Sequence, residues 1–476
     1  MLPQDSYWRC ERATRVSVII DADDYFGAAR EAMMKARRQI LLVGWDFDAR
    51  INLAWENEPP GVPTTVGAFI GWLVKRNPQL EVHILRWDTG AIKTLFRGKT
   101  LWTLTKWRLL RRRIHLKLDG HHPLGASHHQ KIVVIDDCLA FCGGIDMTDE
   151  RWDTRAHRDD DPHRVTPGGT PSKPWHDATT ALQGPVAKAL GELCRTRWQI
   201  AGGKPIATPA PHDDCWPDRL TPDFTDVDVA ISRSQPEHGD QPAIVEIESL
   251  YVALIARAKR RIYAESQYFA SRRVAEAIAA RLAEPDGPEI VIVNPVSAQG
   301  WLEPIAMDTA RARLVSALRR LDTHGRFRMY HPVTAGGTPI YVHAKILVID
   351  DEVIRIGSSN FNNRSLRLDT ECDVTIESGD DADRAARIAA IRDGLLAEHL
   401  GCDDAGIAQA LAAHGLIGAI EALRGEGKTL IPYEIPDLTA VERWLAENEV
   451  LDPEGPGALF EGMDKGGLLR RLRRKG

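Results

Sequence analysis

Two short stretches of the sequence each combine a histidine, a lysine and an aspartate with an apolar run. The first is SHHQKIVVIDD (127–137) and the second is VHAKILVIDD (342–351), and both have the spacing H-x-K-x-x-x-x-D. The residues concerned are His129, Lys131 and Asp136 in the first stretch and His343, Lys345 and Asp350 in the second. Side chains two residues apart on a strand point to the same face, so we expect each histidine to emerge beside its lysine.

Two such pairs suit the cleavage of a phosphodiester, which is anionic and slow to hydrolyse. Paired lysines neutralise the non-bridging oxygens and stabilise the charge that develops in the transition state. One neutral histidine attacks phosphorus, and a protonated one gives its proton to the leaving alcohol. The ordinary pKa of histidine, about 6.5, allows both states near neutrality. The scheme requires no metal and no cofactor. A single pair would more often be an ordinary core histidine and lysine, and the second copy favours catalysis.

The elements around the two stretches are duplicated as well. A helical pattern, a basic pair and short apolar strands precede each stretch, and a glycine turn and a further strand follow it. The matched segments are 25–48 with 251–269, 80–88 with 288–296, 114–120 with 327–333, 143–146 with 357–360, and 176–183 with 370–378. Helices interleaved with strands predict an α/β fold in which helices cover both faces of a sheet.

Four further motifs resemble those of one protein family. They are RWD (151–153), PWHD (174–177), AESQYF (264–269) and GSSNFNNRS (357–365). Together with the two H-x-K-x-x-x-x-D motifs, they make the chain from about residue 22 to 378 resemble the phospholipase D superfamily. They resemble its phospholipase-type branch rather than the short nucleases.

This resemblance implies a fold and a mechanism. The fold is a pair of pseudo-twofold related α/β/α sandwich lobes with one active site in the cleft between them, here followed by a small C-terminal appendage. The mechanism passes through a covalent phosphohistidine. Carried over to this sequence, it makes His129 the nucleophile and His343 the general acid, which then acts as general base toward water. Lys131 and Lys345 hold the phosphate oxygens.

Two further pairs of residues have expected roles. The resemblance assigns Asn360 and Asp146 to phosphate binding, although the general pattern of the family has asparagine at the position of Asp146. The motif aspartates Asp136 and Asp350 lie too far along their strands to touch the histidines. We expect both to be structural and to tie the end of the strand to neighbouring backbone.

The carboxylates that orient the histidines are expected on the strands after the glycine turns. By resemblance, Asp177 serves His129 and Glu371 serves His343. Such a carboxylate holds the imidazole in the required tautomer. A solvated strand end is the alternative role for both carboxylates.

Composition divides the chain into four parts. Residues 202–228 are rich in proline, glycine and aspartate and predict a linker between the lobes. We expect an N-terminal lobe over 1–210, a linker over 211–235, a C-terminal lobe over 236–400 and an appendage over 401–476.

Bulk properties limit the classes of partner and compartment. The net charge is −6 and the pI about 6.3, so we expect no nucleic-acid partner. Seven cysteines without C-x-x-C argue against a disulfide scaffold and against a cysteine zinc site. The sequence shows no apolar secretory segment and no uncharged apolar run of about 18 residues. We expect a monomer in the cytoplasm, peripheral at the inner face of the membrane.

Several histidines are candidate metal ligands. His121, His122 and His128 cluster in the sequence near His129. Adjacent residues on a strand point to opposite faces, so His128 cannot share a face with His129. A zinc site there is a minor alternative, and we predict no metal in the active site.

Two basic segments and three aromatic residues are candidates for contact with lipid. Lys93–Arg113 alternates basic with aromatic residues, and Met463–Gly476 is basic and amphipathic. The first could equally be a helix packed on its own domain or a contact for a nucleic-acid backbone, and the second could be a frayed tail. Tyr7, Trp8 and Trp45 are expected near the mouth of the cleft.

The predicted function is a phospholipase D-type phosphodiesterase and transphosphatidylase. It hydrolyses a glycerophospholipid at a membrane surface to phosphatidic acid and a free headgroup, and a primary alcohol can replace water because the intermediate does not dictate the acceptor. A cardiolipin synthase-like phosphatidyltransferase, a phosphodiester nuclease and a binding module with an inactive site are the alternatives.

Overall fold

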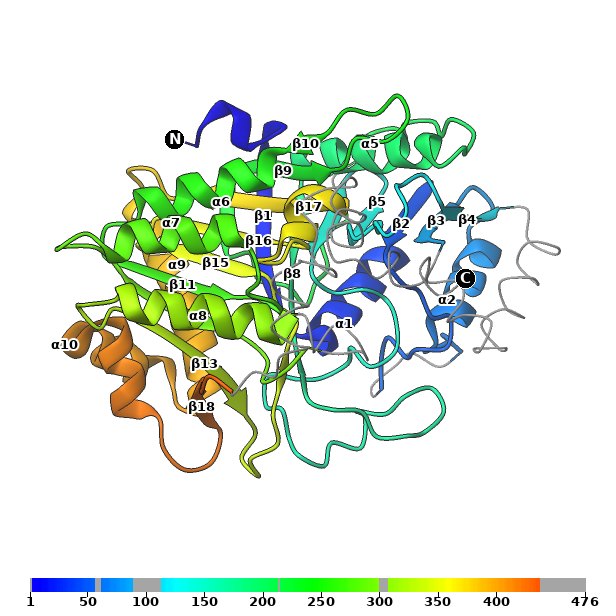
Figure 1. Cartoon of the computed structure of the whole chain (residues 1–476). Helices are drawn as coiled ribbons and strands as arrows, with labels where there is room; N and C mark the ends of the chain where they lie inside the picture. Colours follow the sequence, from blue (N-terminus) through cyan, green and yellow to red (C-terminus); the bar gives the residue numbers. More distant parts are fainter. Residues whose placement is uncertain (1, 56–60, 89–112, 213–214, 299–306, 437–476) are drawn as a thin grey trace, which may run out of the picture.

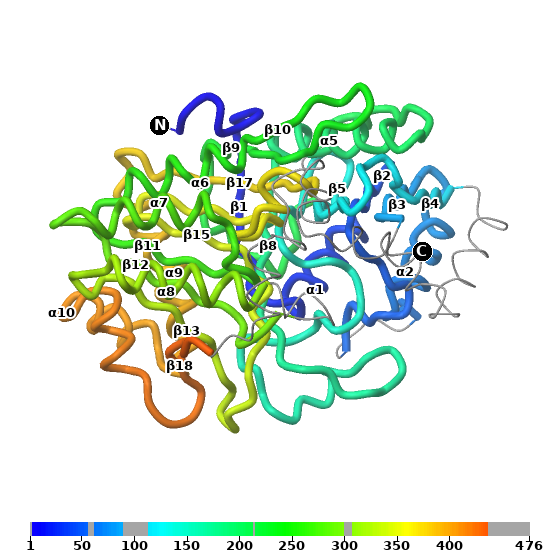
Figure 2. The backbone as a smooth tube through the Cα atoms, viewed as in Figure 1, coloured from blue at the N-terminus to red at the C-terminus, as the bar shows by residue number. Residues whose placement is uncertain are grey.

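A computed structural model describes residues 2–55, 61–88, 113–212, 215–298 and 307–436. Within these residues, the strands form one 16-stranded mixed sheet and a separate two-stranded sheet. Figures 1 and 2 show the two halves of the chain side by side, with the N-terminal half in blue and cyan and the C-terminal half in green and yellow. Both halves contribute to the same sheet, which therefore runs through the whole molecule.

The order of strands in the large sheet has an approximate twofold symmetry. From one edge it reads β4-β3-β2-β5-β6-β8-β1, and from the other, after β18, it reads β13-β12-β11-β15-β16-β17-β9. The first set is β1 (Arg9–Ile20), β2 (Gln39–Gly44), β3 (Glu81–Trp87), β4 (Ile114–Asp119), β5 (Ile132–Ile135), β6 (Leu139–Gly143) and β8 (Ala178–Gln183). The second set is β9 (Phe224–Gln235), β11 (Arg261–Glu265), β12 (Glu289–Val293), β13 (Phe327–Val333), β15 (Ile346–Ile349), β16 (Val353–Gly357) and β17 (Glu371–Glu377). β1 and β9 pair antiparallel at the centre, where the pseudo-twofold axis lies.

Helices cover both faces of the sheet, as predicted. The helices are α1 (Ala22–Met34), α2 (Val66–Arg76), α5 (Pro185–Ile200), α6 (Glu246–Arg257), α7 (Arg272–Leu282), α8 (Thr309–Leu321), α9 (Ala382–Leu400) and α10 (Asp404–Leu423). One core, shared by both halves, packs α5, α9 and α10 on one face. On the other face, α1 and α2 cover the N-terminal strands and α6, α7 and α8 cover the C-terminal strands. Each motif strand therefore alternates its side chains between two cores, which explains its continuous apolar run.

The predicted linker, 211–235, is wrong in its second half. Phe224–Gln235 is the strand β9, and it pairs with β1 on one side and with β17 on the other. A two-residue strand, β10 (Ile244–Val245), pairs with it as well. The proline and aspartate content concealed an alternating pattern, because Val227, Val229 and Ile231 are all buried in one core. The other domain boundaries stay predictions.

The predicted appendage continues the C-terminal half. α10 packs on α9 and β12, and the edge strand β18 (Thr429–Pro432) pairs antiparallel with β13. Among the described residues, only α10 is long and apolar enough to cross a membrane, judged by length and composition. Gly415 breaks α10, with φ 72°, and the buried core helix of a folded domain passes the same test.

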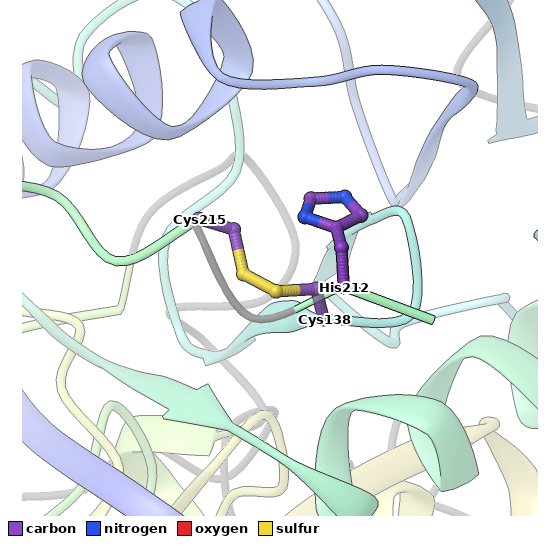
Figure 3. Close-up of side chains that lie close together, drawn as sticks. All are labelled: Cys138, His212 and Cys215. Carbon is purple, nitrogen blue, oxygen red and sulfur yellow. A yellow bond between two sulfur atoms is a disulfide. The ribbon is translucent and has the colours of Figure 1, made fainter. Parts of the chain in front are cut away.

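A disulfide joins Cys138 and Cys215, which are 77 residues apart, with His212 beside it (Figure 3). The composition argued against a disulfide scaffold, and this single disulfide was not predicted; the other five cysteines are free. Cysteine number and spacing could not reveal the pair, because only folding brings Cys215, in the segment before β9, against Cys138 in the turn between β5 and β6. Disulfides persist mainly in oxidising compartments, and the cytoplasmic location stays a prediction that cell fractionation would test.

Removal of this disulfide is expected to destabilise the protein. Closing a loop of this length restricts the unfolded chain, and the loss of a native disulfide costs about 2 to 5 kcal/mol. Cys138→Ser should unfold at a lower temperature than the wild type in a thermal scan, and dithiothreitol should remove the difference. Cys10→Ser is the control, since Cys10 is a free, exposed cysteine. Equal midpoints for wild type and Cys138→Ser would contradict the stabilising role.

Candidate active site

The motif aspartates anchor the ends of β5 and β15. The carboxylate of Asp136 accepts the backbone N–H groups of residues 37–39 at 2.5–2.9 Å, and Asp350 accepts those of residues 259–261 at 2.5–2.8 Å. Each aspartate opens a tight turn in the left-handed region, with φ 51° and 53°. These are structural contacts of the kind expected from the sequence, and they fix β5 beside β2 and β15 beside β11.

The histidine and lysine of each motif lie just before these strands. The ammonium of Lys131 donates to the backbone carbonyl of His129 at 2.9 Å, and Lys345 donates to that of His343. Each lysine thus contacts the backbone of its own histidine. The four residues lie outside the strands, so the shared face expected from the i, i+2 spacing stays a prediction. Lys131 and Lys345 are both buried, so their cationic ends are held within the protein.

Each motif pairs with backbone from the opposite half of the chain. The N–H of His129 donates to the carbonyl of Thr370 at 2.9 Å, and the N–H of His343 donates to that of His176 at 2.7 Å. The two-stranded sheet also joins the two halves of the chain, because β7 (Trp175–His176) pairs with β14 (Tyr341–Val342). The pseudo-twofold axis therefore passes between the two histidine–lysine pairs.

The orienting carboxylates are crossed relative to the expectation. Nδ1 of His129 lies 2.9 and 3.0 Å from the two carboxylate oxygens of Glu371, and Nδ1 of His343 lies 2.6 Å from Asp177. The predicted pairing of Asp177 with His129 and of Glu371 with His343 is wrong. The resemblance assigned each histidine a carboxylate from its own half. In the structure, Glu371 at the start of β17 contacts the first motif, and Asp177 just before β8 contacts the second.

These contacts define the chemistry of the imidazoles. When Nδ1–H donates to a carboxylate, Nε2 is left as the basic, nucleophilic nitrogen, and an imidazolium is stabilised. Both carboxylates are completely buried, so they are shielded from water and hold the rings rigidly. The site thus presents two oriented imidazoles and two ammonium groups.

Asp146 and Asn360 occupy equivalent positions in the two halves. Oδ1 of Asp146 accepts the N–H of Trp45 at 3.0 Å, and Oδ1 of Asn360 accepts the N–H of Gln267 at 3.3 Å. The second oxygen of Asp146 lies 3.2 Å from the ammonium of Lys131. A carboxylate offers only acceptors, so we now assign Asp146 to positioning Lys131 and not to phosphate binding. The amide of Asn360 keeps a donor and stays a candidate for the phosphate.

Burial reduces the charge of the site. It lowers the pKa of Lys345 to about 7 and raises the pKa of Glu371 to about 8. Burial, reinforced by the nearby lysines, also lowers the pKa of His129 and His343 well below the usual value. A bound phosphodiester would supply the missing negative charge, which favours the protonated forms of Lys345 and His343.

Three residues near the site had no role in the sequence prediction. The rings of Trp175 and His343 are 5.0 Å apart, and the guanidinium of Arg151 lies 4.2 Å from the centre of the Trp175 ring. Gln267 contacts both Lys345 and Asn360 at 3.5 Å. All three fall in motifs that resemble the family, so the motif letters were the available signal. Arg151 adds a positive charge that acts on His343.

The other candidates from the sequence lie elsewhere. His128 is buried, and its Nδ1 lies 2.7 Å from the hydroxyl oxygen of Thr370, whereas the His129 ring contacts Glu371. The described His, Cys, Asp and Glu side chains gather as possible metal ligands in four places, none of which includes His121, His122 or His128. Trp45 lies 6.5 Å from the His129 ring, whereas Trp8 packs between two arginines at β1 and β9. Lys93–Arg113, except for its last residue, and Met463–Gly476 lie outside the described residues.

Family models match most of the two halves. A model described as "Phospholipase D" matches residues 32–213, and one described as "Cardiolipin synthase, PLD-like domain" matches residues 251–390. Each match contains one histidine–lysine motif. The two models together contain every residue of the candidate site.

Curated relatives and a solved structure agree with these models. Phospholipase D alpha 1 of Carica papaya is 24% identical, with 71% of this chain and 58% of the papaya protein covered. Phospholipase D A of Dictyostelium discoideum is also 24% identical, with 77% of this chain and 33% of that protein covered. The chain thus spans less than two thirds of these relatives. Phosphatidylserine synthase from Haemophilus influenzae Rd KW20 has the same fold, with a TM-score of 0.54, 13% identity and coverage of 80% of this chain and 86% of that one.

Proposed function

Because this chain belongs to the phospholipase D superfamily, we propose that it is a phospholipase D-type enzyme that hydrolyses glycerophospholipids to phosphatidic acid. The observation that carries the proposal is the pair of imidazoles held by crossed carboxylates, each beside a buried lysine. This arrangement supplies a nucleophile, a proton donor and two cations without further groups. The substrate is a lipid at a membrane surface, and the enzyme works as a monomer.

The first half of the reaction forms a covalent intermediate. Nε2 of His129 attacks phosphorus, a P–N bond forms, and the P–O bond to the headgroup breaks. Protonated His343 gives its proton to the departing headgroup oxygen. Lys131, Lys345 and the amide of Asn360 stabilise the charge on the non-bridging oxygens.

The second half releases the product. Neutral His343 takes a proton from water, and the resulting hydroxide attacks phosphorus as the P–N bond to His129 breaks. Phosphatidic acid leaves and the proton remains on His343, ready for the next cycle. A primary alcohol in place of water gives a phosphatidyl alcohol by the same steps.

Product analysis tests the function. Phosphatidylcholine vesicles with added ethanol should yield phosphatidic acid and phosphatidylethanol, measured by mass spectrometry. His129→Ala, which lacks the nucleophile, is the control. Cleavage of plasmid DNA with no change in the lipids would reject the proposal and identify a nuclease.

A phosphatidyltransferase that joins two lipids is the second candidate. It is favoured by the cardiolipin synthase-type model over 251–390 and by the fold shared with a phosphatidylserine synthase. Vesicles of phosphatidylglycerol distinguish it, because cardiolipin and glycerol would then be the main products, with little phosphatidic acid.

The pH dependence of kcat/KM is expected to reflect Lys345. Its pKa of about 7 means that the ammonium loses its charge as the pH rises through neutrality. Since kcat/KM reports ionisations of the free enzyme, it should fall with rising pH as His343, whose pKa lies well below its usual value, loses the acid proton, and should fall more steeply above about pH 7 as Lys345 loses its charge. Burial keeps His129 neutral to well below its usual pKa, so no loss is expected from it between pH 6 and 7. The measurement uses a soluble short-chain phosphodiester from pH 5 to 9, and a kcat/KM that still rises between pH 7 and 9 would contradict the assignment.

A further inference from the structure

A second cluster of histidines and carboxylates is sealed inside the protein next to Asp177. It consists of Asp21 before α1, His157 in the segment between β6 and β7, His176 in β7 and Glu398 in α9. The four side chains are at most 1% exposed. They come from four different elements and from both halves of the chain, and none of them has a role in the proposed reaction.

One atom of each side chain faces the same small space. Nε2 of His157 lies 3.0 Å from Oε1 of Glu398 and 3.4 Å from Oδ2 of Asp21. Nδ1 of His176 lies 2.8 Å from the same Glu398 oxygen and 3.3 Å from Oδ1 of Asp21. In a tetrahedral site with metal–ligand bonds of about 2.0 to 2.1 Å, neighbouring ligand atoms are about 3.3 Å apart. The separations of 2.8, 3.0 and 3.4 Å are close to this edge length, and the ligand atoms of the four residues all lie within 4.8 Å of one another; the 3.3 Å contact involves Oδ1 of Asp21, which also accepts the N–H of Asp177.

In each histidine, the ring nitrogen that faces away from the common space (the outer atom) contacts a further carboxylate. Asp153 lies 3.0 Å from Nδ1 of His157, and Glu265 lies 2.7 Å from Nε2 of His176. Metal-binding histidines are usually oriented in this way, because the outer contact fixes which nitrogen carries the proton and turns the other toward the ion.

The outer oxygens of the two carboxylates are held as well. Arg155 donates to Oε2 of Glu398 at 2.6 Å, and the N–H of Asp177 donates to Oδ1 of Asp21 at 3.0 Å. All four side chains thus have an outer atom with a defined partner and an inner atom that faces the common space.

Two of the inner atoms make no hydrogen bond within the described part of the chain. They are Nδ1 of His176 and Oδ2 of Asp21. Nδ1 of His176 lies 2.8 Å from Glu398 and 3.3 Å from Asp21, so both carboxylates are close to this nitrogen. Buried polar atoms of this kind cost free energy unless something satisfies them. A cation in the common space would contact both at once.

We infer that Asp21, His157, His176 and Glu398 bind one divalent cation, with zinc favoured by the two imidazole and two carboxylate ligands and by the tetrahedral spacing. Zinc would take the place of two protons that the histidines must otherwise carry to balance the same carboxylates. The site is structural, because all four ligands come from the protein and leave no position for substrate.

The cation would fix the geometry of the proposed general acid. His176 is adjacent to Asp177, whose carboxylate contacts His343, and the carbonyl of His176 accepts the N–H of His343 at 2.7 Å. Glu398, which lies in α9, would bind the same cation and so connect α9 to His176. Loss of the ion would therefore loosen Asp177 and His343 together, while His129 and Glu371 would keep their contacts.

Metal analysis of the whole protein tests the inference. The full chain, purified without a metal-affinity tag or metal column, should contain about one equivalent of zinc by plasma mass spectrometry. Unfolding in guanidinium with a chelator and refolding with Co²⁺ should give the visible absorption of a four-coordinate cobalt ion. Protein that folds without metal and takes up neither Zn²⁺ nor Co²⁺ would overturn the inference and assign the cluster to two protonated histidines.

Variants identify the ligands. Asp21→Asn and Glu398→Gln should each lower the affinity for zinc by more than about tenfold, because the loss of even an outer partner of a ligand has an effect of about this size. His399→Gln is the matched control, because His399 is equally buried and contacts Glu265 but does not belong to the group formed by Asp21, His157, His176 and Glu398. If the ligand variants fail to fold, the metal content and cobalt spectrum of the wild type decide the question. Full zinc in a folded Asp21→Asn protein, or loss of zinc only in His399→Gln, would refute the ligand assignment. Lipid products are measured separately, so failure of the proposed function leaves this test intact.

Discussion

The His129→Ala protein is expected to turn over phosphodiesters at least about 10⁴-fold more slowly than the wild type and to form no covalent phosphoenzyme. Loss of the nucleophile in a catalytic group that acts as a unit has effects of this order or larger. Alanine removes the only nitrogen proposed to bond to phosphorus, and the lysines cannot replace it as nucleophile. The measurement is mass spectrometry of protein quenched in base during turnover of a short-chain phosphatidylcholine.

His343→Ala provides the comparison. It should also lose turnover with ordinary lipids, because the headgroup leaves unprotonated. With a p-nitrophenyl phosphodiester, whose leaving group needs no proton, it should still form the phosphoenzyme, which should accumulate because no base activates water. A phosphoenzyme in His129→Ala, or its absence from His343→Ala with the activated substrate, would show that the roles of the two histidines are exchanged.

Glu371→Gln and Asp177→Asn are each expected to lower turnover about 10³-fold or more, through different histidines. Replacing the carboxylate behind a catalytic histidine removes the charge that stabilises the imidazolium and favours the wrong tautomer, with effects up to about 10⁴-fold. Glu371 contacts His129 and Asp177 contacts His343, so the first variant should impair attack and the second should impair protonation of the leaving group.

The leaving group separates the two variants. The burst of p-nitrophenol from an activated diester should be largely restored in Asp177→Asn and should stay slow in Glu371→Gln. Thermal unfolding of both variants controls for stability, because both carboxylates are buried. Restoration in Glu371→Gln alone would mean that each carboxylate serves the histidine of its own half, contrary to the crossed contacts.

The sequence by itself was sufficient to predict the α/β architecture and the residues of the candidate site. The apolar run of each motif predicted buried strands, and Ile132–Ile135 and Ile346–Ile349 are β5 and β15. The duplication predicted an α/β fold with helices on both faces of a sheet, and the resemblance to the phospholipase D superfamily implied the pseudo-twofold relation of the two halves. The strands and helices depend on local hydrophobic periodicity, which consecutive residues show directly. A single sequence was therefore sufficient to predict them.

Only the tertiary structure decided which residues meet across the molecule. The crossed contacts join residues 242 and 166 positions apart, the disulfide joins residues 77 apart, and β9 fills the centre of the sheet where composition had indicated a linker. The four-residue cluster behind Asp177 gathers Asp21, His157, His176 and Glu398, which no motif connects. Such contacts depend on how the two halves pack about their axis. Many residues of the shared core contribute to the free energy of that packing, so the packing cannot be predicted from any short stretch of sequence.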